Sequence, residues 1–309
     1  MTGPINTRAV IKAASAHLKG VAGHVFDLLT ITKPVSPTAA VNLAKVISKL
    51  SPLLGNMIEF NTVELLNADD TFVKHGKWVR QDPGFPDTVF KGAVTPRPGF
   101  EIKAWLPLAT EITARFKDSQ NHFLEDNTYV AMLAWLPENL IYGRPCIIDV
   151  CVVSGLSVAK ARDDHYHNPP DYLVLEPGDT SLRTQNLQQT NTAGYKWQGA
   201  AADFRKATEL VRSWGPAGAK YLATQHYQAK VRELLSRYPY RLDTNFAKMD
   251  RVVHGEIEAF KSRVMAKRVH GMSIQEWKRL LASGNDAQIQ AVLKNKFDIK
   301  EGNADELIQ

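Results

Sequence analysis

The stretch from Phe85 to Trp105 restricts the fold of this 309-residue chain more than any other part of it. Its second half, Phe100–Trp105, has the pattern of a strand, and the Gly- and Pro-containing segment Gly92–Gly99 supplies a turn back to an earlier strand. Side chains alternate between the faces of a strand, so Glu101 and Lys103 would share one face. Phe100, Ile102 and Ala104, which alternate with them along the strand, would then point into a core. The stretch therefore predicts a hairpin within a larger sheet.

Short β-like runs bounded by glycine and proline surround this hairpin. The predicted strands are Phe72–Arg80, Thr88–Lys91, Phe100–Trp105, Tyr129–Leu136, Cys146–Val153 and Asp171–Leu175. A helix is expected over Leu108–Lys117. Strands and helices mixed in this way predict an α/β or α+β protein with a central mixed β-sheet flanked by helices.

Apolar residues recur at helical intervals near both ends of the chain. The predicted helices are Arg8–Leu29, a helix capped by Ser36 and ending near Leu50, a third helix restarted by Ser51-Pro52 and ending near Leu66, and Ala200–Trp214. From Tyr221 onward we expect helices only. This organisation predicts a core domain over residues 1–225, which includes the N-terminal helices, and a helical C-terminal region over residues 226–309.

The central hairpin also carries residues with catalytic chemistry. Asp87 lies at the start of its first strand, where antiparallel pairing would place it beside Glu101. Two carboxylates and a lysine suit phosphodiester hydrolysis with a divalent cation. Asp87, Glu101 and the Ile102 carbonyl would hold Mg²⁺, a hard ion that prefers oxygen ligands. Lys103 would orient the attacking water and stabilise the transition state, or would accept a proton if its pKa is depressed.

Each of these residues also has a plain structural interpretation. Glu101 and Lys103 could form a surface ion pair, worth under about 1 kcal/mol. Glu59, an acid among apolar residues of the third predicted helix, could enter the site from that helix, or could be an ordinary surface carboxylate. Glu64 is the weaker candidate for the same position.

A polar segment over residues 178–198 is rich in asparagine and glutamine. These amides can pair with adenine, and arginine can pair with guanine. The candidate base-reading residues are Arg183, Gln185, Asn186, Gln188, Gln189, Asn191 and Lys196. A polar surface loop without a binding role is the alternative interpretation.

Taken together, these motifs resemble a known enzyme family. Pro86-Asp87, thirteen intervening residues and Glu101-Ile102-Lys103 resemble the signature of the PD-(D/E)xK nucleases. Glu59 is similar to the extra helical acid of many type II restriction endonucleases, and the polar segment resembles a specificity segment. The resemblance covers Ser51 to about Gln198. It implies a restriction-endonuclease-like fold, Mg²⁺-dependent cleavage of double-stranded DNA, and a homodimer that acts on a palindromic site.

Three functions follow from this reading. The first is a type II restriction endonuclease, with residues 226–309 used for dimerisation or for contact with the DNA backbone. The second is a repair or structure-specific nuclease of the same superfamily. The third is a non-catalytic DNA-binding protein in which the acids are structural; it predicts metal-independent binding with a steep salt dependence.

Charge and cysteine content set the expected environment. The net charge is +6 and the pI is about 9.1, which favours an anionic partner. Cys146 and Cys151, at an odd spacing in one predicted strand, would face opposite ways, which argues against a disulfide and agrees with a reducing cytoplasm. We expect no signal peptide, no membrane segment and, since no Gly-rich phosphate loop stands out, no nucleotide cofactor.

Overall fold

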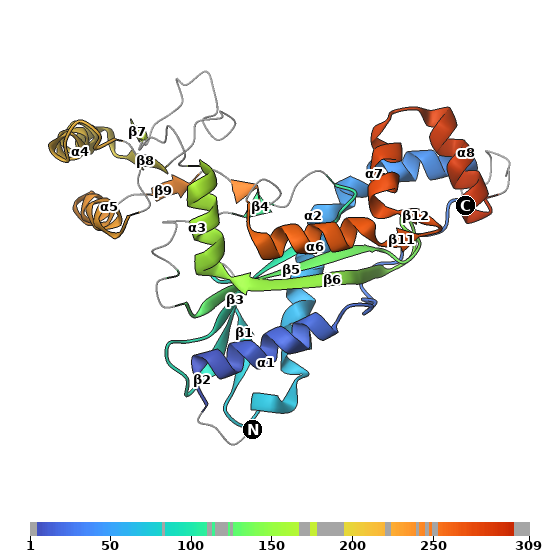
Figure 1. Ribbon diagram of the computed structural model, residues 1–309, viewed down its shortest axis with the longest axis horizontal. Helices are drawn as coiled ribbons and strands as arrows, with labels where there is room; N and C mark the ends of the chain where they lie inside the picture. The colour runs from blue at the N-terminus through green and yellow to red at the C-terminus, as the bar shows by residue number, and fades with distance from the viewer. Residues whose placement is uncertain are drawn as a thin grey trace. The chain divides into compact units, whose positions relative to one another are not determined.

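The computed structural model describes residues 5–81, 84–109, 113–114, 123, 126–166, 174–177, 195–219, 224–238, 241–244, 247–248 and 253–299. The chain divides into two compact units. The first comprises residues 1–110, 127–153 and 255–309, and the second comprises residues 111–126 and 154–254. Figure 1 labels the elements of both units.

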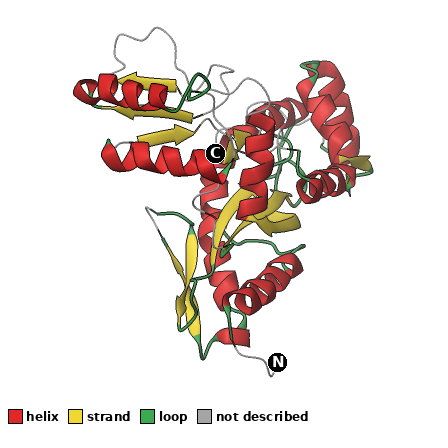
Figure 2. Ribbon diagram, turned by 60° about the vertical axis from the view of Figure 1, so that its left-hand side comes forward, coloured by secondary structure: helices red, strands yellow, loops and turns green. Residues whose placement is uncertain are grey.

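A mixed five-stranded sheet forms the centre of the first unit (Figures 1 and 2). Its strands, in spatial order, are β1 (Gly76–Arg80), β2 (Thr88–Gly92), β3 (Gly99–Trp105), β5 (Thr128–Pro137) and β6 (Pro145–Ser154). Strand β2 is antiparallel to both of its neighbours, β1 and β3, whereas β3 and β5 run parallel. The residues from 130 to 136 in β5 are at most 2% exposed, as expected for a strand covered on both faces. The prediction of a mixed sheet is confirmed.

The first unit contains helices from both ends of the chain, of which α1 and α2 pack directly on the sheet. They are α1 (Thr7–Gly20), α2 (Pro37–Asn67), α6 (Gly255–Ala266), α7 (Ile274–Ala282) and α8 (Asp286–Phe297), with a single 3₁₀ turn, η1, over Asp70–Phe72. The long helix α2 packs on β1 and β3, and α8 packs on α2. Lys45 of α2 and Asp286 of α8 form an ion pair at 2.7 Å, which joins the two ends of the sequence.

The helix α2 is continuous, so the predicted break at Ser51-Pro52 is wrong. Ser36 caps it as expected, because its side chain accepts a hydrogen bond from the backbone of Ala39. Pro52 lacks the N–H that would bond one turn back, a loss that often breaks a helix. Here Ile47 and Leu54, on either side of the proline, are at most 1% exposed. Burial of this face holds the helix together across the proline.

The first helix is shorter than predicted, because α1 ends at Gly20 instead of Leu29. The residues beyond it run beside β6, where Val25 bridges to Cys146 and Ile31 bridges to Gly143. Their apolar spacing is compatible with a helix, but they form turns at residues 21–23 and 27–28 and bridge to the sheet at Val25 and Ile31. A tertiary contact has overridden the local pattern.

The C-terminal part contains strands as well as helices, which corrects the prediction of helices only. Strands β11 (Arg268–Val269) and β12 (Met272–Ser273) form a hairpin between α6 and α7. His270 and Gly271 connect them, with φ values of 49° and 81°. A two-residue loop with both φ values positive matches the twist of a hairpin, so this glycine makes a tight turn.

The second unit contains a three-stranded sheet and a helical pair. Its elements are β4 (Thr113–Ala114), α3 (Gly155–Tyr166), β7 (Val174–Pro177), β8 (Tyr195–Gly199), α4 (Ala201–Ser213), α5 (Gln225–Arg237), β9 (Arg241–Thr244) and β10 (Ala247–Lys248). The sheet has the order β7-β8-β9, and β4 pairs with β10. Helix α4 confirms the helix predicted over Ala200–Trp214. The helix predicted over Leu108–Lys117 is wrong at β4, whose two residues pair with a distant strand.

Both cysteines are free thiols, as their positions in the predicted strand indicated. Cys151 is buried, and burial raises the pKa of its thiol to about 11, which leaves little thiolate at neutral pH. Across the described segments, no helix combines the length and the apolar character needed to cross a bilayer.

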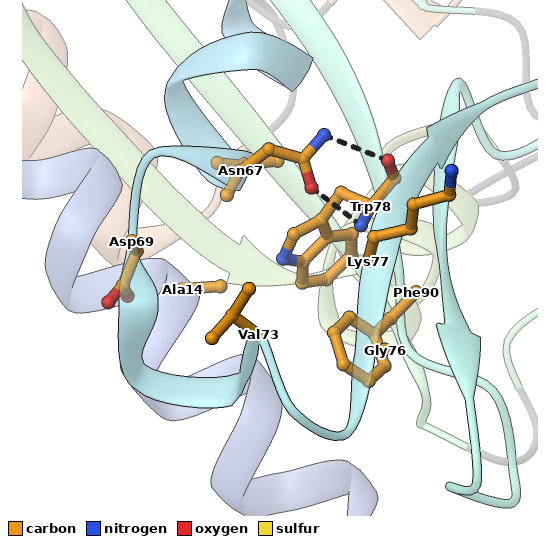
Figure 3. Close-up of a pocket in the computed structure, with 9 residues that line it drawn as sticks. Ala14, Asn67, Asp69, Val73, Gly76, Lys77, Trp78 and Phe90 are labelled. Carbon is orange, nitrogen blue, oxygen red and sulfur yellow. Dashed lines mark hydrogen bonds between the residues drawn. The ribbon is translucent and has the colours of Figure 1, made fainter.

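The side chain of Asn67, at the C-terminal end of α2, forms hydrogen bonds with the outer edge of the sheet. Asn67 donates a hydrogen bond from its amide to the carbonyl of Trp78 at 3.0 Å and accepts one from the N–H of Trp78 at 2.8 Å. The amide thereby takes the place of a neighbouring strand beside β1. Figure 3 shows both bonds at the wall of a cavity of about 300 Å³, whose floor includes Trp78 and Phe90.

We expect Asn67→Ala to lower the free energy of unfolding by about 1–3 kcal/mol, because two backbone groups of β1 lose their partners. Asn67→Asp should also destabilise the protein, since a carboxylate would face the carbonyl of Trp78. Chemical denaturation measures both. Asn56→Ala, at an exposed position of α2, is the control and should stay near wild type. An Asn67→Ala protein as stable as this control would contradict the role of the amide.

Candidate active site

Strands β2 and β3 of the central hairpin separate at the end away from their turn. This separation leaves one edge of β3 without a neighbouring strand. Strands β2 and β3 pair only at Thr88 with Phe100 and at Val89 with Gly99. On its other edge β3 pairs with β5 along its whole length. N–H groups of alternate residues in a strand point to the same edge. Beyond the last β2 pair, those of Ile102 and Ala104 therefore need acceptors other than a strand.

Two carboxylates supply these acceptors. Asp87, the residue before β2, accepts a hydrogen bond from the N–H of Ile102 at 2.7 Å through Oδ2. Glu59, from α2, accepts one from the N–H of Ala104 at 3.1 Å through Oε1. The structure thus brings Glu59 to this edge, whereas Glu64 lies exposed on another face of α2.

Lys103 connects the acids to one another. Its ammonium lies 2.7 Å from Oε1 of Glu101 and 3.4 Å from Oδ2 of Asp87, and it donates a hydrogen bond to the carbonyl of Ile102 at 2.9 Å. These three groups are the same ones that the sequence predicts as ligands of a cation. Asp87 comes one residue before the Thr88–Phe100 pair and Glu101 one residue after it, so the hairpin brings both acids to the same end of its ladder.

Burial dominates the electrostatics of this cluster. Glu101 is 7% exposed, and burial raises the pKa of its carboxyl to about 7, with Asp87 adding to the rise and Lys103 opposing it. Burial also raises the pKa of Glu59. For Lys103, burial alone would lower the pKa, but Glu101, Asp87 and Glu59 together raise it above its ordinary value.

The charge state of Lys103 decides between two roles that the sequence leaves open. A lysine with a raised pKa keeps its proton at neutral pH, so it can donate hydrogen bonds and stabilise negative charge. In that protonated state the amine has no lone pair with which to accept a proton. The ammonium of Lys103 is therefore the positive charge that Asp87 and Glu101 share in this structure.

The donor set fits a divalent cation in its chemistry. Asp87, Glu101 and the carbonyl of Ile102 offer only oxygen, the donor that Mg²⁺ prefers. Oε2 of Glu101 is buried and has no hydrogen-bond partner among the described residues. Three carboxylates surround one ammonium, so added positive charge would be favourable. Within the described residues, however, no group of three His, Cys, Asp or Glu side chains is already arranged as a metal site.

Sequence reasoning missed two residues at this edge. A small cavity of about 60 Å³ lies beside the acids and is lined by Glu59, Val63, Arg80, Gln81, Gly84 and Asp87. Gln81 donates to the carbonyl of Asp87 from its backbone at 2.8 Å and to that of Pro86 from its side chain at 3.0 Å, which fixes the approach to β2. The guanidinium of Arg80 lies 4.8 Å from the centre of the Phe60 ring. The sequence indicates that a strand ends at Arg80, but it does not indicate that α2 crosses the end of this strand.

The predicted base-reading residues are largely beyond what the structure describes. Arg183, Gln185, Asn186, Gln188, Gln189 and Asn191 lie outside the described residues. Lys196 is in β8, where its backbone pairs with Val174 and Asp243.

Gly99 provides a test of how closely the hairpin must fit. A Cβ at this position would lie 2.5 Å from Cγ of Pro86, the neighbour of Asp87. We expect Gly99→Ala to cost about 1–3 kcal/mol of stability, since the added methyl forces the chain apart. Thermal denaturation measures this cost. Gly20→Ala is the control, because a Cβ there meets nothing within 4 Å. Equal stability of the two variants would show that Gly99 is not needed for the close approach.

Comparisons with protein-family models, with curated proteins and with solved structures find no match to this chain. No function can be carried over from a relative. The function proposed for the chain therefore rests on the residues gathered around Lys103.

Proposed function

We propose that this protein is a Mg²⁺-dependent endodeoxyribonuclease of the type II restriction class. The observation that supports it is the convergence of Asp87, Glu101 and the Ile102 carbonyl on one cation, the ammonium of Lys103. Ordinary surface ion pairs are exposed, whereas Glu101 is almost fully buried. A buried acid with an unpartnered oxygen is typical of a functional site.

In this proposal Asp87, Glu101 and the carbonyl of Ile102 would hold Mg²⁺. When bound, the ion would supply charge neutralisation and would lower the pKa of a coordinated water. Lys103 would turn from the acids to the reacting phosphate and donate hydrogen bonds to the oxygens that gain charge. Glu59, held by Ala104, would keep a carboxylate beside the cavity, which is large enough for water.

The proposed partner is double-stranded DNA, bound by a homodimer. Two copies related by a two-fold axis present two sites, one for each DNA strand. The net charge of +6 supports binding to a polyanion, with an affinity that falls as salt rises. The amide-rich segment over residues 178–198 is the proposed reader of the DNA sequence.

Digestion of a sequenced plasmid with Mg²⁺ tests this function directly. We expect discrete fragments, with ends that run-off sequencing places at one short repeated sequence, and no cleavage in EDTA. Cleavage only at mismatches, junctions or free ends would instead identify a repair or structure-specific nuclease. Salt-dependent binding with no cleavage in any divalent metal would identify a non-catalytic DNA-binding protein.

A further inference from the structure

The register of the sheet holds Arg80 beside the candidate active site. Arg80 is the last residue of β1, and its backbone pairs with Thr88, the residue that follows Asp87. Side chains two apart in a strand share a face, so Arg80 lies on the same face of β1 as Trp78. Trp78 is buried, whereas Arg80 is exposed. The sheet thus places an exposed guanidinium next to a proposed metal ligand.

The ring of Phe60 orients this guanidinium. Phe60 follows Glu59 in α2, and the carboxylate of Glu59 is bonded to the N–H of Ala104. The central carbon of the Arg80 guanidinium is 4.8 Å from the centre of the Phe60 ring, which makes a cation–π contact. Stacking of this kind engages the flat face of a guanidinium, and the N–H groups point outward in its plane. A guanidinium stacked in this way is oriented for a ligand that approaches its edge.

Arg80 and two acids of the site line one cavity. Glu59, Asp87 and Arg80 all border the cavity of about 60 Å³. The electrostatics indicate the same proximity, because burial is the main cause that raises the pKa of Glu59 while the charges of Lys103 and Arg80 act against it. A ligand at the mouth of this cavity would therefore meet a guanidinium as well as the proposed metal ligands.

Arg80 and Lys103 approach Asp87 from different sides. The rings of Trp78 and Phe100 are 5.1 Å apart, so these two residues and Arg80 share one face of the sheet. Lys103 comes three residues after Phe100 and points to the other face. Asp87 precedes β2, the strand between β1 and β3. Lys103 is the proposed donor to the reacting phosphate, so Arg80 is placed to contact a different one.

We propose that Arg80 binds a backbone phosphate of the DNA adjacent to the phosphate that is cut. This inference rests on the proposed function, because it takes DNA as the ligand. Two parallel N–H groups of a guanidinium match two oxygens of a phosphate. The five N–H donors of a guanidinium allow it to serve a protein partner and a phosphate together. Arg80 holds the DNA strand in this arrangement and does not touch the reacting atoms.

The salt dependence of duplex binding tests this contact. Phosphate contacts carry no sequence information, so a short labelled duplex of arbitrary sequence serves as the probe, in EDTA to prevent cleavage. Each phosphate contact adds about 0.9 to the slope of log affinity against log salt. Arg80→Ala should therefore lower the slope by about 0.9 and raise the dissociation constant roughly eightfold at about 0.1 M NaCl.

Arg97→Ala is the matched control. Arg97 is exposed in the turn between β2 and β3, at the other end of the hairpin, so this variant removes the same charge away from the site. Its slope and dissociation constant should stay near those of wild type. Arg80→Lys should keep the slope but weaken binding, because an ammonium lacks the planar fork. Circular dichroism checks that each variant is folded.

Phe60 should act only through Arg80, as a positioning residue. We expect Phe60→Leu to weaken duplex binding about threefold in the wild-type background, because the guanidinium loses the ring that orients it. In the Arg80→Ala background the same change should have no further effect. Equal weakening in both backgrounds would show that the ring does not act through Arg80 and would overturn this part of the proposal.

The outcomes separate this inference from the proposed nuclease activity. If wild type binds the duplex but Arg80→Ala and Arg97→Ala have equal slopes, the role of Arg80 is wrong and the nuclease proposal stands or falls by its own test. The expected slopes in a protein that does not cut DNA with Mg²⁺ would support Arg80 and overturn the nuclease. A wild type that does not bind the duplex would overturn both.

Cleavage by a saturating amount of protein distinguishes binding from catalysis. Arg80→Ala should then cut within about threefold of the wild-type rate, because lost binding is compensated by concentration. A loss as large as that expected for Lys103→Ala would place Arg80 among the catalytic groups and would overturn a role in binding alone.

Discussion

Lys103→Ala is expected to lower the rate of Mg²⁺-dependent DNA cleavage by about 1,000-fold, the scale seen when an enzyme loses one donor aimed at developing charge. The ammonium of Lys103 contacts both Asp87 and Glu101. Its removal takes away the donor for the transition state. It also leaves two carboxylates without their partner, which should cost about 3 kcal/mol of stability.

Single-turnover cleavage, measured well below the melting temperature of the variant, separates the two effects. Lys91→Ala is the matched control, because Lys91 lies exposed on β2 of the same hairpin and should leave the rate unchanged. Lys103→Arg keeps the charge but not the compact shape, and should restore part of the stability with little of the rate. If Lys103→Ala cleaves DNA like wild type, the assignment of the site is wrong.

Glu101→Gln should lower cleavage by about 100-fold or more and, unlike most changes to a buried residue, should make the protein more stable. Burial raises the pKa of Glu101 to about 7 from the ordinary value of 4.5, so the folded state resists ionisation of this acid. The unfolded chain ionises freely. Glutamine resembles the protonated acid and avoids this cost, which is about 1–3 kcal/mol at pH 8.

The stability difference between Glu101→Gln and wild type should depend on pH in a defined direction. Below pH 4.5 both states of the wild type are protonated, so the two proteins should be equally stable. Between pH 4.5 and 7 the unfolded wild type loses its proton while the folded one keeps it, and the advantage of the variant grows; above pH 7 it is constant. Thermal melts at pH 5 and pH 8 measure the trend. Glu64→Gln, at an exposed position of α2, is the control variant. An advantage of Glu101→Gln that shrinks toward pH 8 would contradict the burial argument.

Local patterns were sufficient for the hairpin and its acids. The alternation in Phe100–Trp105 and the turn before it predict that Asp87 lies beside Glu101. In the structure the ladder of β2 and β3 ends at Thr88 and Phe100, Asp87 bonds to the N–H of Ile102, and both acids contact Lys103. A strand has a period of two, so a slip of one residue would turn Glu101 and Lys103 to the face that now holds Phe100 and Ile102. The register is for that reason readable from sequence.

Contacts between distant segments could not be read in the same way. A helical period separates Glu59 from Glu64 but does not say which of them faces β3. The break expected at Pro52 is absent because Ile47 and Leu54 are buried on both sides of it. Arg80 and Gln81 border the site only because α2 crosses the end of β1. In each case packing between elements decided the outcome.

The partners within the candidate site are far apart along the chain, which has a consequence for synthesis. Glu59 bonds to a residue 45 positions later, and β3 gains its long edge only from β5, which ends at Pro137. A ribosome that has released residues up to 110 has made every proposed catalytic group but not the strand that holds them. We therefore expect a nascent or truncated chain to be inert toward DNA, so that the proposed cutting activity would appear only after β5 has paired with β3.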